Sequence, residues 1–123
     1  MQGLLIKPYW GNLILSGEKT WEIRGSQTHK RGKIGIIMSG SGKVWGEVDL
    51  VDCFPCTLEL FGRNQLKHRI LHHGLLARYN QPWVWVLENP VKYPEPITYN
   101  HPQGAVIWVN LDRGIEDDQS NSV

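Results

Sequence analysis

Short blocks of apolar residues recur along this chain, and the spacing inside each block predicts its secondary structure. Residues 3–7 form an apolar run that is typical of a buried strand. Pro8 follows at the first turn of a predicted helix, in which apolar residues recur at helical spacing up to Ile14. Gly17 is then placed to end that helix. We therefore expect a strand and a short helix at the start of the chain.

Several later segments have the period-two alternation or the β-branched composition of strands. The first of them alternates polar and apolar side chains, which predicts a half-buried strand with Glu22 and Arg24 on its polar side. The turn sequence Ser-Gly-Ser-Gly at 39–42 predicts an antiparallel hairpin between the strands on either side of it. The strands are expected at 20–24, 34–38, 44–51, 83–87 and 104–111.

The main helix is predicted between Asn64 and Tyr79, before the helix-ending Pro82. Its apolar stripe consists of Leu66, Ile70, Leu71 and Leu75. Further along, Asn89 and Pro90 are expected to end the strand at 83–87, because proline cannot donate a ladder hydrogen bond.

Five or six short strands and two main helices predict an α+β fold built on a small mixed β-barrel. The chain has 123 residues, which fits one domain, and 41% hydrophobic and 20% charged residues are typical of a folded protein. We expect this domain to span residues 1–111. Residues 112–123 are acidic and without periodicity, so we expect a disordered tail there.

The net charge of the chain does not exclude any class of ligand. The net charge is +1, and residues 1–111 alone carry 12 basic and 8 acidic side chains. This balance permits an anionic ligand, although it is weaker than the basic footprint of most nucleic-acid-binding domains. No apolar run approaches the ~18 residues of a membrane span, and the first residues lack the pattern of a secretory signal. We therefore expect a cytoplasmic protein without membrane contact.

Candidate chemistry gathers around the first helix and the strand after it. Lys7 precedes a helix start whose N–H groups lack partners, so a phosphate could bind there, or Lys7 could simply be solvated. Glu22 and Arg24 are close enough to pair, and Lys19 stands at the turn just before them. A surface ion pair is the simpler interpretation and contributes only ~0–1 kcal/mol, which is a weak reason for choosing these residue types.

The same residues resemble a known family. The pattern consists of Lys-Pro at 7–8, Ser-Gly-x-Lys-Thr-x-Glu-x-Arg at 16–24, Gly-x-Val-x-Leu-Val-Asp at 46–52, Trp-Val-Leu-Glu-Asn-Pro at 85–90 and Glu-Pro-Ile at 95–97. It resembles the ASCH domain family, which is related to PUA domains, and the resemblance spans residues 4–111. It implies a β-barrel flanked by helices, with a cleft near the Gly-x-Lys-Thr segment that binds RNA or a nucleotide.

The resemblance implies two enzymatic alternatives. Some bacterial members are amidohydrolases that remove the acetyl group from acetylated cytidine with a lysine, a threonine and a glutamate. Lys19 matches the lysine, but Glu22 stands in place of the threonine, and a carboxylate cannot act as a hydroxyl nucleophile. No acidic residue occurs between Glu59 and Glu88 to supply the expected partner.

Other members of the family are ribonucleases that act on single strands. In that case Glu22 would take a proton from a ribose 2′-hydroxyl, while Lys19 or Arg24 neutralises charge on the phosphorane, without a metal. Whether the chain is an enzyme stays open at this point.

The six tryptophans divide into two groups. Trp21, Trp83 and one of Trp85 or Trp108 are expected in the core of so small a domain. Trp10 and Trp45 are candidates to stack on a base, with ordinary packing as the alternative.

Cys53, Cys56, His68 and His72 are the residues of the chain whose spacing comes near to that of a zinc site. Their spacing is one residue short of a zinc-finger pattern, and such a finger would interrupt the predicted strand before it. We expect two reduced thiols, no metal and no cofactor.

The sequence therefore predicts a domain that binds single-stranded RNA or a modified nucleotide. The binding residues are expected to be Lys7, Trp10, Lys19, Thr20, Glu22, Arg24 and Trp45, with Lys19, Glu22 and Arg24 catalytic if the chain is an enzyme. The alternatives are a hydrolase acting on RNA or on a modified nucleoside, and a protein-interaction domain.

Overall fold

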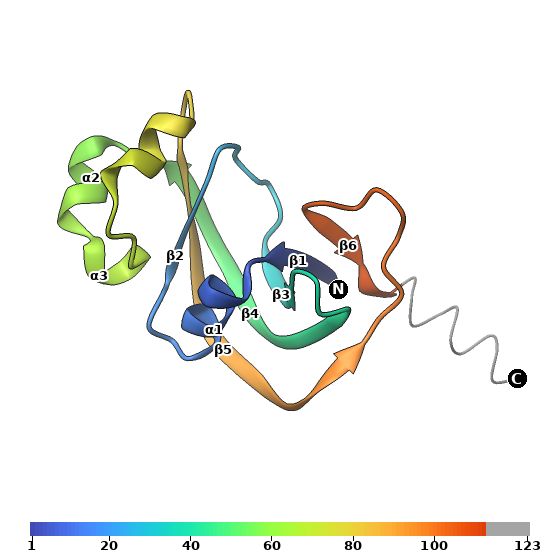
Figure 1. Ribbon diagram of the computed structural model, residues 1–123. Coiled ribbons are helices and arrows are strands. Elements are labelled where there is room, and N and C mark those ends of the chain that lie inside the picture. Colours follow the sequence, from blue (N-terminus) through green and yellow to red (C-terminus); the bar gives the residue numbers. More distant parts are fainter. Residues whose placement is uncertain (113–123) are drawn as a thin grey trace, which may run out of the picture.

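The structure is a computed structural model and describes residues 1–112, apart from the side chains of residues 73 and 75 (Figure 1). Its elements are β1 (Gln2–Ile6), α1 (Pro8–Leu15), β2 (Trp21–Arg24), β3 (Gly32–Met38), β4 (Lys43–Pro55), α2 (Leu58–Arg63), α3 (Gln65–His68), the 3₁₀ helix η1 (His73–Arg78), β5 (Trp83–Thr98) and β6 (Trp108–Asn110). The α+β fold, the early strand and helix, and the strand before residue 25 are confirmed.

The six strands form one mixed sheet in the order β2-β5-β4-β3-β1-β6. β1 runs parallel to β3, and the other neighbours are antiparallel. The predicted hairpin is formed by β3 and β4, with Ile34 opposite Val48. The long strands β4 and β5 cross the whole molecule and carry the curvature of the sheet (Figure 1).

Backbone pairing does not close this sheet into a barrel, since β2 and β6 are its two edges. Side chains bridge the edges instead. Trp85 on β5 stacks on Trp108 on β6 with ring centroids 5.7 Å apart, and its indole N–H donates to the Ser26 carbonyl at 3.0 Å. Arg24 at the end of β2 donates from Nη2 to the Leu5 carbonyl on β1 at 3.1 Å. The sheet is therefore curled but open, and side-chain contacts connect its two ends.

The core lies inside this curl and is sealed by α1. The largest cluster joins the buried Leu4, Ile14, Ile36, Leu50 and Trp85. A second cluster packs β2 against α2, α3 and η1 around Trp21, Phe61 and Val84. Of the predicted core tryptophans, Trp21 and Trp85 are buried, whereas Trp83 and Trp108 are half-buried.

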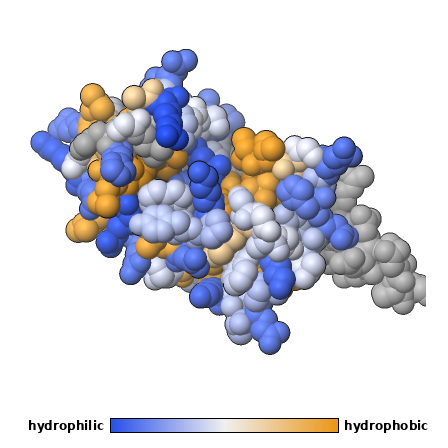
Figure 2. Space-filling model, in the orientation of Figure 1, coloured by the Kyte–Doolittle hydropathy of each residue, from blue (hydrophilic) through white to orange (hydrophobic). Residues whose placement is uncertain are grey.

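The predicted helix at 64–79 is wrong. The chain instead forms α2, α3 and η1, with Arg69 in the left-handed region (φ 61°) at the end of α3. Leu66 and Leu71 are 70% and 76% exposed, so the apolar stripe is not a packed face. Figure 2 shows apolar side chains at the surface over the end of the molecule that α2 and α3 occupy. His68, not a leucine, is the buried anchor of α3.

The predicted end of a strand at Asn89 and Pro90 is also wrong, because β5 continues to Thr98. β2 pairs only with residues 83–86, so the rest of β5 has β4 as its one partner among the described strands. Prolines are tolerated there because one side of the strand needs no N–H donor. Asn89 has a positive φ of 53°, and the register with β4 shifts three times.

The C-terminal strand is shorter than expected, since β6 covers only Trp108–Asn110. Asp112 is still held by the domain, because its backbone N–H donates to the Asn110 side chain and its carboxylate pairs with the amino group of Met1. The rest of the predicted acidic tail lies outside the described residues. None of the helices in residues 1–112 has the length and apolar character needed to cross a membrane.

Candidate functional site

Lys19, Glu22 and Arg24 form a buried ion cluster. Lys19 Nζ lies 3.6 Å from Glu22 Oε1, and Arg24 Nε donates to Glu22 Oε2 at 3.0 Å. Lys19 is 1% exposed and Glu22 is 6% exposed, while Arg24 is half-buried. The simpler interpretation, a surface ion pair, is therefore wrong, and the strand is more deeply buried than the predicted half-buried strand, because α3 and η1 cover this end of β2.

Lys19 reaches Glu22 because it stands before the first residue of β2 and does not follow the alternation of the strand. Its ammonium donates to the carbonyl of His68, the last residue of α3, at 2.6 Å. It also lies 4.6 Å from the centre of the Trp10 ring. Burial lowers the pKa of Lys19, and the Glu22 carboxylate beside it opposes that shift.

His68 fixes the carbonyl that Lys19 uses. Its Nδ1 accepts the Ile70 backbone N–H at 2.9 Å, so Nε2 carries the proton and donates to the Phe61 carbonyl at 2.7 Å. The His68 ring stacks on Phe61 with centroids 4.1 Å apart. The backbone of α3 is tied to the same segment, since Thr20 N–H donates to the Lys67 carbonyl at 2.9 Å. These contacts hold Lys19 in one place.

Every buried polar side-chain atom in the described part of the chain has a hydrogen-bond partner. This matters here because charges withdrawn from water are costly unless they are paired and hydrogen-bonded. A buried ion cluster is nevertheless a poor way to gain stability, since apolar residues of similar volume often serve as well. Stability alone is therefore a weak reason for burying this cluster.

Glu22 faces a pocket of about 310 Å³, which we call the Glu22 pocket. Its polar and aromatic lining consists of Lys7, Trp10, Glu22, Arg24, Ser39, Arg78 and Tyr79. Lys7 and Arg78 are exposed, so two cations lie at the opening while the carboxylate lies on the wall. The pocket thus combines aromatic rings, exposed positive charge and one fixed acceptor.

The predicted binding residues divide among three places. Lys7, Trp10, Glu22 and Arg24 line the Glu22 pocket together. Lys19 is buried beside Glu22, so it supports the carboxylate and has no exposed ammonium for a phosphate.

Two predicted residues lie elsewhere. Thr20 lines a separate pocket of about 450 Å³ beside the end of α1, and the buried Lys19 also contributes to the lining of that pocket. Trp45 packs against the main core and donates its indole N–H to Ser41 Oγ at 3.1 Å, and it is not part of the Glu22 pocket.

Sequence reasoning missed Ser39, Arg78 and Tyr79. The last two fell within the predicted helix, which placed Arg78 on a solvent face. Tyr79 reaches the pocket because its ring rests on Gly25, where an added Cβ would lie 2.6 Å from Tyr79 Cδ1. Gly25, directly after the Glu-x-Arg motif, is the signal in the sequence that leaves space for an aromatic ring beside the end of β2.

The proposed zinc ligands do not meet in the described residues, which contain no group of three or more metal-binding side chains. Both ring nitrogens of His68 are bonded to backbone groups, and Cys53 and Cys56 are free thiols.

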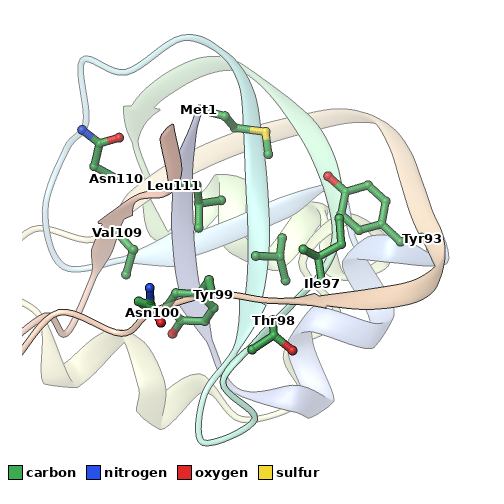
Figure 3. A pocket seen from close by; sticks show the side chains of 10 residues that line it. Met1, Tyr93, Ile97, Thr98, Tyr99, Asn100, Val109, Asn110 and Leu111 are labelled. Carbon is green, nitrogen blue, oxygen red and sulfur yellow. The ribbon is translucent and has the colours of Figure 1, made fainter. Parts of the chain in front are cut away.

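A smaller apolar pocket of about 70 Å³ lies between the end of β5 and β6, lined by Val44, Ile97, Tyr99, Val109 and Leu111 among others (Figure 3). It belongs to the third core cluster and shares no residue with the Glu22 pocket.

Comparison with known proteins agrees with this architecture. The ASCH domain matches residues 4–97. A serine-to-alanine variant of the ASCH protein from Zymomonas mobilis superposes with a TM-score of 0.71 at 18% identity, covering 98% of this chain and 94% of that one. The ASCH structure from Zymomonas mobilis without that substitution gives 0.69 at 16% identity, with 99% and 94% covered. No curated protein matches the chain. This chain therefore belongs to the ASCH domain family.

Proposed function

We propose that this ASCH domain binds single-stranded RNA or a nucleotide in the Glu22 pocket. The observation that carries the proposal is a carboxylate held between two buried or half-buried cations on the wall of a pocket that also contains aromatic rings and exposed basic residues. A concave pocket in which a few polar groups converge among aromatic side chains is a general sign of a binding or catalytic site. We place this activity in the cytoplasm, as the sequence leads us to expect.

The chemistry of the wall suits a nucleobase. Trp10 and Tyr79 supply ring faces, and stacking on an aromatic side chain contributes ~1–3 kcal/mol per base. An ionised carboxylate accepts hydrogen bonds only, so Glu22 selects a base edge or a ribose hydroxyl that donates. Because Lys19 and Arg24 hold both Glu22 oxygens, little ordering is needed when the ligand binds.

The opening of the pocket suits phosphate. Lys7 and Arg78 are exposed and line the pocket, and the pocket has no carboxylate besides Glu22 among its lining residues. Contacts between phosphate and these side chains would position the strand without reading its sequence.

The test is the affinity for a fluorescently labelled single-stranded RNA of about ten nucleotides, measured by anisotropy over a series of salt concentrations. We expect a steep decrease with salt, and we expect Lys7→Ala and Arg78→Ala each to reduce the slope by about 0.7, the value for one phosphate contact on a single strand. Lys33→Ala is the matched control, because Lys33 is exposed on β3 and lines no part of this pocket. A response that is flat in salt, or an equal effect of the control, would remove phosphate contact from the proposal and favour a protein-interaction domain.

Cleavage of the bound RNA is a second candidate function, favoured by the position of Glu22 in the pocket with Arg24 beside it. Glu22 would accept the proton of a ribose 2′-hydroxyl while the 2′-oxygen attacks the phosphorus, and the 5′-oxygen would leave with a proton from water. Labelled RNA incubated with wild type and with Glu22→Gln should then give a 2′,3′-cyclic phosphate with the wild type only. Removal of an acetyl group is not proposed, since position 22 carries no hydroxyl and Lys19 is buried.

A further inference from the structure

A second pocket adjoins the Glu22 pocket. It has a volume of about 370 Å³, and we call it the Tyr99 pocket; its lining includes Leu5, Ser39, Gly42, Tyr99, His101 and Val106. Leu5 and Ser39 line both pockets. The two pockets are therefore neighbours on either side of one short wall.

The wall between the two pockets is held in place by hydrogen bonds of Leu5 and Ser39. The Leu5 carbonyl accepts from Arg24 on the side of the Glu22 pocket, and the Leu5 N–H donates to the Ile107 carbonyl, next to Val106, at 2.9 Å. Ser39 N–H donates to the Ile6 carbonyl at 2.8 Å, which places the Ser39 backbone beside the residue that precedes Lys7. Lys7 and Ser39 are both exposed, so a cation and a hydroxyl lie where the two pockets meet.

The Tyr99 pocket differs in chemistry from its neighbour, because none of its lining residues is Lys, Arg, Asp or Glu. Tyr99 OH donates to His101 Nδ1 at 2.7 Å, so Nε2 carries the proton and donates to the Ala105 carbonyl at 3.1 Å. This chain of hydrogen bonds fixes two rings in an edge-to-face arrangement, with centroids 5.8 Å apart. Tyr99 also lines the small apolar pocket, as Figure 3 shows.

The glycine turn at residues 39–42 borders the same pocket, and the Gly42 carbonyl accepts the Tyr99 backbone N–H at 3.3 Å. Gly40 and Gly42 have φ values of 82° and 69°, and no atom lies within 4 Å of the place where their Cβ atoms would be. Side chains there would strain the turn. An uncharged pocket with two fixed rings and a bordering glycine turn suits a nucleobase better than a phosphate.

We propose that the Tyr99 pocket is a second nucleotide subsite, so that the domain binds two consecutive nucleotides of a single strand. One base occupies the Glu22 pocket, the linking phosphodiester crosses the wall between Lys7 and Ser39, and the next base lies against Tyr99 and His101. This inference rests on the function proposed above, and it names the ligand as a chain of at least two nucleotides.

The experiment compares two uncleavable ligands of equal charge by isothermal titration calorimetry. One is 2′-O-methyladenosine 3′-(methyl phosphate), which has the phosphodiester but no second base, and the other is the 2′-O-methyl dinucleotide ApA. We expect ApA to bind about 10-fold more tightly or better, which is the effect of stacking one further base. The gain should persist at high salt, because the second pocket carries no charge.

Exposed positions supply variants that leave the fold intact. Val106 is 78% exposed, and Val106→Glu puts a charge into the second pocket, so the gain of ApA over the mononucleotide should be lost while mononucleotide affinity is unchanged. His101→Ala should reduce the same gain. Val51→Glu is the control, because Val51 is 41% exposed and lines neither pocket.

Two results would overturn the second subsite and leave the proposed function standing: equal affinities for the two ligands, or a gain that survives both Val106→Glu and His101→Ala. Binding of neither ligand would contradict the proposed function itself.

Discussion

Two Lys–Glu pairs of this domain, Lys19–Glu22 and Lys33–Glu47, have the same residue types and opposite environments. Lys33 Nζ lies 3.3 Å from Glu47 Oε1 across β3 and β4, and Tyr93 OH donates to Glu47 Oε2 at 2.9 Å. The Lys33 side chain is 57% exposed, whereas the Lys19 side chain of the buried cluster is 0% exposed. The first pair lies at the surface of the sheet and the second lies beneath a pocket.

The difference in burial supports the proposal that the cluster of Lys19, Glu22 and Arg24 is the one that serves a ligand. An exposed pair gains little and costs little, so Lys33 and Glu47 need no further explanation. Lys19, Glu22 and Arg24 are withdrawn from water at a cost, and Lys19 and Arg24 hold the two oxygens of the Glu22 carboxylate, which lines the Glu22 pocket. The function proposed for that pocket would explain why the costly arrangement is present.

The largest expected difference between the clusters follows loss of the carboxylate charge. Glu22→Gln leaves the buried Lys19 without its counter-ion, and we expect the free energy of unfolding at pH 7 to fall by about 3–5 kcal/mol. Glu47→Gln should cost about 1 kcal/mol or less, because its partner Lys33 is solvated. Urea unfolding of both variants measures this. Equal losses would mean that burial does not distinguish the clusters.

Arg24→Lys tests the buried cluster more finely, because it keeps the positive charge and removes the planar guanidinium group that makes two hydrogen bonds. Lysine cannot contact Glu22 Oε2 and the Leu5 carbonyl together, as Arg24 does from Nε and Nη2. We expect a loss of about 1.5–3 kcal/mol, the range for a hydrogen bond to a charged group, together with weaker RNA binding. A fully stable Arg24→Lys variant would show that the bridge between the sheet edges is dispensable.

A smaller effect is expected on the pH dependence of stability at alkaline pH, to which the buried Lys19 contributes. The pKa of Lys19 is lowered in the folded state, so in the window between that pKa and the ordinary value near 10.5 the unfolded chain binds more protons. The stability of the wild type relative to Lys19→Met should therefore rise as the pH increases through this window. Unfolding free energies of the two proteins, measured between pH 7 and 10, give the slope; a relative stability that falls would contradict the buried position of Lys19.

The smallest effect is expected from Tyr93 in the exposed cluster. Desolvation and the hydrogen bond to Glu47 raise the pKa of Tyr93 to about 12, so the folded protein keeps a proton that the unfolded chain loses near pH 10. The contribution of protonated Tyr93 to the stability of the folded state is therefore complete below pH 10 and is lost as the pH rises toward 12. Tyr93→Phe should lack this loss, which absorbance-monitored unfolding near pH 11 can detect. Identical alkaline profiles would show that the hydrogen bond to Glu47 is not formed in solution.

The early part of the chain was predictable because local signals agree with the final packing there. Pro8 and Gly17 bracket α1, and the Ser-Gly-Ser-Gly turn joins β3 and β4 as expected. The convergence of Glu22 and Arg24 was also visible in the spacing of the strand.

The remainder depends on tertiary contacts that no local pattern contains. The burial of Glu22 comes from α3 and η1, which the sequence presented as one amphipathic helix. Arg78 and Tyr79 enter the pocket only because that helix is broken, with Arg69 in the left-handed region. β5 continues through its prolines because, beyond residue 86, it pairs with β4 alone and needs no N–H donor on its other side. This depends on the arrangement of strands in the sheet and cannot be inferred from the sequence of β5 itself.

The most direct test of the central claim is a titration of ¹⁵N-labelled protein with a short single-stranded RNA, followed by NMR. The side-chain signals of Trp10 and Arg24, which line the Glu22 pocket, should move with saturable shifts, while the Trp45 indole signal on the hairpin stays in place. Shifts confined to Trp45 and the α2 surface, with Trp10 and Arg24 unmoved, would contradict the assignment of the ligand to this pocket.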